Sequence, residues 1–66
     1  MAGNTRGRLK ERFEGIHRNL DWSQEHCRQS LILIEDKNPN LTMAIKALYE
    51  GLTKFDELAQ SIYAKL

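Results

Sequence analysis

Hydrophobic positions in the first half of the chain form one stripe with helical spacing. Steps of four and three residues alternate without interruption from residue 9 to residue 34. This alternation keeps side chains on one face of an α-helix and repeats every seven residues. The members of the stripe are Leu9, Phe13, Ile16, Leu20, Ser23, Cys27, Ser30 and Ile34. We therefore expect a helix over residues 8–36, with an apolar face that narrows at the two serines.

The second half of the chain carries a cleaner stripe with the same period. Its members are Leu41, Ile45, Leu48, Leu52, Phe55, Ala59, Ile62 and Leu66. The single proline, Pro39, lies just before this stripe. Its fixed φ suits the first turn of a helix, and it disfavours the helical conformation for the residue before it. The pattern predicts a second helix over residues 39–65, with Asn38 as its N-cap.

The short connection makes the two helices antiparallel neighbours. The predicted fold class is therefore all-α, an antiparallel helical hairpin. Facing residues are expected to have numbers that add to 75, which mostly places small residues opposite large ones. The expected pairs are Ile34 with Leu41, Ser30 with Ile45, Cys27 with Leu48, Ser23 with Leu52, Leu20 with Phe55, Ile16 with Ala59, Phe13 with Ile62 and Leu9 with Leu66.

An alternative interpretation breaks the first helix near Asp21. Residues 21–24 have the form of a capping box, and Gly15 lowers the local helix propensity. The stripe nevertheless keeps its phase across Asp21, whereas a break would usually reset it. This continuity favours one unbroken helix.

The length of the chain, 66 residues, allows one small core at most. Residues 1–7 contain two glycines and no apolar periodicity, which predicts a flexible basic N-terminal arm. Residues 8–66 are expected to form a single helical-hairpin domain.

Several apolar residues remain outside the seam between the two helices. A helix that is apolar over a wide arc is normally covered by more than one neighbour, and a single helix pair of this size gains little stability. We therefore expect the hairpin to dimerise into a two-fold symmetric four-helix bundle. The alternative is a monomer that presents this surface to a different protein. The candidate dimer-interface residues are Leu31, Ile32, Leu33, Ala44, Ala47, Gly51 and Leu58.

Three aromatic residues with a polar tip lie off the stripes. Trp22, Tyr49 and Tyr63 are candidate partner-binding residues, because such side chains are enriched at protein interfaces. The alternative is that they pack against the second copy of the chain.

Catalytic and metal-binding constellations fail on spacing. Asp21, Ser23 and His26 are the residue types of a nucleophilic triad, but Asp21 is about 200° around the helix from Ser23 and cannot orient the histidine. His17, His26 and Cys27 could ligate a metal, yet the histidines are nine residues apart, not three or four. The sequence therefore predicts no catalytic residue, no metal site and no cofactor.

A basic cluster near the start of the chain is the one local charge asymmetry. It consists of Arg6, Arg8, Lys10 and Arg12, with Glu11 as a countercharge. Clustered arginines can contact phosphates, so nucleic acid is an alternative partner. The simpler interpretation is a solubilising arm, because the net charge is only +1 and no aromatic residue interleaves the cluster.

The compartment expected from the sequence is the cytoplasm. One cysteine cannot form an internal disulfide, and no signal peptide pattern is present. The longest apolar run, residues 31–34, is too short to cross a membrane.

The function that these features favour is a small non-enzymatic helical protein that acts through protein contacts as a homodimer. Such a protein would be a regulator, adaptor or inhibitor, of the kind encoded by phage or bacterial accessory genes. In length and layout the chain also resembles the small RNA-binding hairpin dimers, such as the plasmid copy-number regulator Rop. That resemblance is one of architecture only, and architecture alone does not carry function. The alternative function, which rests on the basic cluster from Arg6 to Arg12, is a hairpin dimer that binds nucleic acid through the basic arm and first helix.

Overall fold

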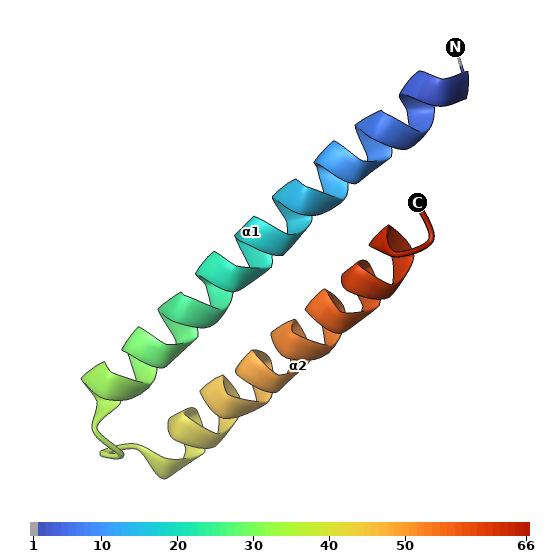
Figure 1. Cartoon of the computed structure of the whole chain (residues 1–66). Coiled ribbons are helices and arrows are strands. Elements are labelled where there is room, and N and C mark those ends of the chain that lie inside the picture. The colour runs from blue at the N-terminus through green and yellow to red at the C-terminus, as the bar shows by residue number, and fades with distance from the viewer. Residues whose placement is uncertain (1) are drawn as a thin grey trace.

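The protein folds as an antiparallel hairpin of two helices, α1 (Ala2–Ile34) and α2 (Pro39–Tyr63) (Figure 1). The structure, a computed structural model, describes residues 2–66 and the side chains from Thr5 onward. The hairpin is elongated, with extents of 55 × 15 × 11 Å. The predicted all-α antiparallel hairpin is therefore confirmed.

The first helix begins earlier than the sequence suggested. α1 starts at Ala2, not near residue 8, so residues 2–7 of the predicted arm belong to this helix. Met1 lies outside the described residues. Because α1 has 33 residues and α2 has 25, the N-terminal end of α1 extends beyond the end of α2 (Figure 1). The helix is also continuous through Asp21, so the alternative with a break there was wrong.

The reversal of the chain depends on two residues in the left-handed region. Glu35 has φ 52° and Asp36 has φ 60°, and α1 consequently ends at Ile34, two residues before the expected end. The backbone N–H of Lys37 donates to the carbonyl of Ile34 at 3.0 Å and closes this turn. Such backbone conformations are uncommon for residues other than glycine, although aspartate tolerates them better than most.

The start of α2 has the predicted capping arrangement. Asn38 has an extended backbone, and its side-chain Oδ1 accepts a hydrogen bond from the N–H of Leu41 at 3.1 Å. Pro39 is the first helical residue, where its missing N–H costs nothing. The cap and the proline together define where the second helix begins.

The face that α2 turns toward α1 differs from the predicted stripe at every second position. The side chains of Leu41, Leu48, Phe55 and Ile62 are 47%, 57%, 64% and 37% exposed, so the predicted pairing was wrong at these positions. The next residue along the chain lies on the α1 side in each case, and these residues are Thr42, Tyr49, Asp56 and Tyr63. A step of one residue turns the contact face by about 100°. Both rows have the same seven-residue period, so the period alone does not distinguish them.

The first helix shows the same displacement. Leu9 is 41% exposed and Ile16 is 40% exposed, although both were expected to face α2. Gln24 and Leu31, which lie outside the predicted stripe, are half-buried instead. Cys27 is buried in accordance with the prediction.

The interface between the two helices buries very few side chains. Among the described residues only Cys27, Thr42 and Ala59 are buried, and none of the large apolar side chains is. These three side chains are small, so their burial contributes little hydrophobic stabilisation. The isolated hairpin therefore lacks a core of the usual size.

Thr42 provides a test of this packing, because its buried Oγ1 has no hydrogen-bond partner among the described residues. An unpaired buried hydroxyl costs about 1–3 kcal/mol. We expect Thr42→Val to raise the free energy of unfolding by about 1 kcal/mol in urea titrations followed by circular dichroism.

Thr53→Val is the matched control. The Thr53 hydroxyl accepts from Gln24 at 2.8 Å and donates to the Tyr49 carbonyl at 3.1 Å. Removing it should lower the free energy of unfolding by about 1 kcal/mol at the same protein concentration. A Thr42→Val change that lowers the free energy of unfolding would show that the Thr42 hydroxyl is not buried without a partner.

Candidate interaction surfaces

One edge of the hairpin is a ladder of polar side-chain contacts between α1 and α2. Four side chains of α1 each contact one side chain of α2 at hydrogen-bond distance. The pairs are Glu14 with Tyr63 at 2.9 Å, His17 with Asp56 at 2.7 Å, Gln24 with Thr53 at 2.8 Å and Arg28 with Tyr49 at 2.7 Å. We call this set the polar edge. Its bonds determine which side of each helix faces the other.

Arg28 is the most connected residue of the polar edge. Its guanidinium donates to the Tyr49 hydroxyl, lies 5.5 Å from the centre of the Tyr49 ring and forms an ion pair with Glu25 at 3.0 Å. The hydrogen bond from Arg28, together with a weaker one from Gln29, lowers the pKa of Glu25. The Glu25 carboxylate in turn raises the pKa of Arg28. Tyr49 is therefore held by contacts within the hairpin.

Tyr63 is engaged in the same way at the other end of α2. Its hydroxyl donates to the Glu14 carboxylate, and this hydrogen bond raises the pKa of Tyr63 above its usual value of 10. Tyr49 and Tyr63 are both half-buried. The structure thus places two of the three candidate partner-binding aromatics between the helices of one hairpin.

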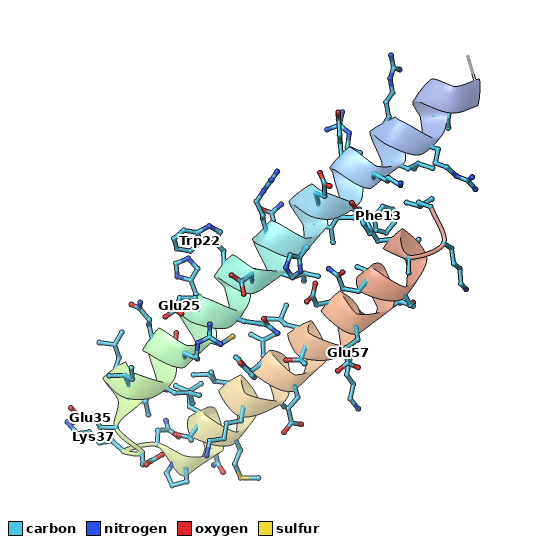
Figure 2. All side chains as sticks on the ribbon, viewed as in Figure 1. Phe13, Trp22, Glu25, Glu35, Lys37 and Glu57 are labelled. Carbon is cyan, nitrogen blue, oxygen red and sulfur yellow. The ribbon has the colours of Figure 1, made fainter. Side chains whose placement is uncertain are left out.

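Trp22, the third candidate, points outward from α1 and away from α2 (Figure 2). Its side chain is 65% exposed, and its ring centroid lies 6.0 Å from that of His26 at an interplanar angle of 31°. Leu33 lies farther along α1 and is 81% exposed. Eleven residues separate the two side chains, a spacing that places both on the outer side of α1.

The other edge of α2 carries an apolar row with steps of three and four residues. Each large member comes one residue before a residue that faces α1. One residue is a turn of about 100° around the helix, so the row lies on the edge opposite the polar one. No member is charged, and every member but Gly51 is exposed. The members are Leu41, Ala44, Leu48, Gly51, Phe55, Leu58 and Ile62. We call this set the α2 apolar row.

The candidate dimer-interface residues fall into four places. Ala44, Gly51 and Leu58 belong to the α2 apolar row. Ile32 and Leu33 are exposed at the end of α1, and Ala47 is exposed on α2. Leu31 is half-buried in the hairpin. The large exposed residues Leu48 and Phe55 were missed, because the predicted stripe assigned them to the contact with α1.

The residues considered for catalysis or metal binding are not assembled into a site. Asp21 and His26 are exposed, Ser23 is half-buried, and no hydrogen bond in the described part of the chain joins them. Cys27 is a buried free cysteine, and His17 is bound to Asp56. Over residues 2–66 no three His, Cys, Asp or Glu side chains gather as a metal site.

The basic cluster lies along the first turns of α1. Arg6, Arg8, Lys10 and Arg12 are all exposed. The beginning of α1 extends beyond the end of α2, so at least the first of these residues have no neighbouring helix from the same chain (Figure 1). This end of the hairpin is a positively charged projection.

The contact between His17 and Asp56 predicts a pH dependence of the hairpin. The hydrogen bond to Asp56 raises the pKa of His17 above its usual value of 6.5. The stabilisation is therefore fully present below about pH 6.5 and is lost as the pH rises through the raised pKa. We expect Asp56→Asn to lower the pKa of His17, measured by NMR titration of its ring protons, and to remove this part of the pH dependence of unfolding. An unchanged pKa in Asp56→Asn would show that the contact does not form in solution.

In the described part of the chain, neither helix has the length and apolar content needed to span a membrane. Comparison with family models, curated proteins and solved structures finds no match for this chain.

Proposed function

We propose that this protein is a small non-enzymatic binding protein that acts through protein–protein contacts as a homodimer. The observation that carries this proposal is the imbalance between what the hairpin buries and what it exposes. It buries Cys27, Thr42 and Ala59, while large side chains such as Leu48 and Phe55 are more than half exposed. Burying a side chain such as leucine or phenylalanine contributes about 1.5–3 kcal/mol, so association offers more stabilisation than the hairpin itself obtains.

The total exposed area supports the same proposal. A folded monomeric protein of 7.7 kDa exposes about 4,300 Å². The hairpin exposes 5416 Å². The excess is about 1,100 Å², which is comparable to the roughly 800 Å² that each partner buries in a stable complex. One protein partner of ordinary size would cover it.

The outer side of α1 is the surface that we assign to a further protein partner. Trp22 lies there, on the side that points away from α2 (Figure 2). Tryptophan is enriched, together with tyrosine and arginine, among the residues that dominate binding at protein interfaces. A homodimer that associates through α2 would leave Trp22 accessible, as a regulator, adaptor or inhibitor requires.

A non-enzymatic role agrees with the hydrogen bonds that polar side chains make within the hairpin. Two side chains capable of acid or base chemistry, His17 and Glu14, are paired with Asp56 and Tyr63 along the polar edge. These pairs hold the two helices together. The buried free Cys27 fits a reducing compartment, so we place the protein in the cytoplasm.

Nucleic-acid binding is the second candidate, and the projecting basic end of α1 favours it. Arg6, Arg8, Lys10 and Arg12 are exposed on that end, where a phosphate backbone could approach. A dimer would carry two such ends. We rank this candidate second because four screened charges per chain give weak and non-specific affinity at physiological salt.

Light scattering tests the homodimer directly. We expect twice the chain mass of 7.7 kDa at micromolar concentration, with high helicity by circular dichroism. Leu48→Glu should lose the dimer, because it places a charge in the α2 apolar row. Met43→Glu should keep it, because Met43 is 70% exposed on α2 but lies outside this row. A folded monomer at this concentration would refute self-association.

Salt dependence separates the two candidate functions. If the basic cluster binds nucleic acid, replacing Arg6, Arg8, Lys10 and Arg12 by glutamine should weaken binding and reduce the log–log salt slope by close to one unit per lost phosphate contact. We expect instead that the wild-type chain binds DNA and RNA only weakly at about 0.15 M salt. Tight binding that the glutamine variant loses would reverse the ranking.

A further inference from the structure

We propose that a second copy of this chain covers the α2 apolar row, with α2 packed antiparallel against the α2 of the other copy and the two-fold axis at Gly51. This inference rests on the proposed homodimer and adds which face associates and in which orientation. The row extends almost equally far on both sides of Gly51.

The row matches itself in position when it is paired with a second copy in the antiparallel direction. Residues whose numbers add to 102 or 103 then face each other, and Gly51 faces its own copy. Ala44 then lies opposite Leu58, and a small side chain opposite a large one allows two helices to interdigitate. The remaining pairs are Leu41 with Ile62, Ala44 with Leu58 and Leu48 with Phe55.

Gly51 has no explanation within a single hairpin. It lies in the interior of α2 without a positive φ, and no side chain or neighbouring helix lies within 4 Å of the position that a Cβ would occupy. Glycine is a poor helix former at such a position. At a two-fold axis the missing side chain has a use, because it lets two helix backbones approach each other closely.

The composition of the two helices favours α2 against α2 over α2 against α1 of the other copy. The exposed edge of α1 around Leu9 and Ile16 also carries Arg12 and Asn19. Covering it with the α2 apolar row would remove those polar groups from water without providing partners, which is costly. Two uncharged rows can cover each other without this cost.

The antiparallel direction is favoured over the parallel one. A parallel pair would place Ala44 against Ala44, leaving a gap, and would crowd Phe55 against Phe55. It would also bring Lys54, which flanks the row, beside the same residue of the other copy. Repulsion between like charges and uneven packing both disfavour that arrangement.

The first experiment compares Gly51→Ala with the matched variant Gly15→Ala. Both add a methyl group in open space of the hairpin. A Cβ at Gly51 would have no atom within 4 Å, and a Cβ at Gly15 would have only Arg18 Nη2 at 4.0 Å. Gly15→Ala should leave the dimer dissociation constant unchanged or slightly improved. Gly51→Ala should raise it roughly tenfold or more, since overpacking a close helix contact is unfavourable. Sedimentation equilibrium measures both.

The outcomes separate this inference from the proposed function. A dimer that Gly51→Ala leaves intact or strengthens would refute the axis at Gly51, while the homodimer itself would stand. A wild-type chain that is monomeric at all concentrations tested would refute both.

The second experiment determines the orientation by disulfide cross-linking in a Cys27→Ala background whose helicity is verified by circular dichroism. Ala44→Cys mixed with Leu58→Cys should give a cross-linked heterodimer on oxidation. Ala44→Cys alone should not cross-link, because the two copies of residue 44 lie about 20 Å apart and a disulfide needs Cα atoms within about 7 Å. Lys46→Cys mixed with Leu58→Cys is the negative control. Efficient cross-linking of Ala44→Cys to itself would refute the antiparallel pairing.

Discussion

A helix in a two-helix hairpin can turn only one face toward its single neighbour. Both helices here are apolar over a wider arc than one contact can cover. Contact with α1 covers the side of α2 that contains Thr42 and Ala59, and the adjacent apolar row stays exposed. The two-helix shape therefore accounts for both the small core and the exposed apolar row.

The polar edge decides which part of that arc is covered. Its exposed bonds, such as the ion pair between His17 and Asp56, contribute little stability in water. They are directional, however, and hydrogen bonds lose strength quickly when their geometry changes. Rotating α2 to bury Leu48 and Phe55 against α1 would break the bonds to Tyr49 and Asp56. The polar contacts thus belong to one orientation of the helices, in which the apolar row stays exposed.

The sequence was sufficient for the parts of the fold that depend on local signals. Asn38 and Pro39 predicted the start of α2, and the seven-residue period predicted two antiparallel helices. The rotation of α2 was not predictable in the same way, because Leu48 and Tyr49 belong to adjacent rows with identical spacing. Hydrophobicity favoured Leu48, whereas the bond from Arg28 to Tyr49 joins residues 21 positions apart. The start of α1 was missed because the glycines and polar residues before Arg8 carry no apolar period.

The two helices of the hairpin carry different exposed surfaces, the apolar row on α2 and Trp22 with the basic end on α1. Association through α2 would use side chains such as Leu48 and Phe55, which lie on the edge opposite the polar contacts. Trp22 and the basic end belong to α1, so a dimer would present two copies of each on its outside. Two identical sites held at a constant distance bind a repeated or symmetric partner more tightly than one site can, because the second contact forms intramolecularly. A short chain with one weak core can in this way form a stable assembly and a bivalent binding surface with the same two helices.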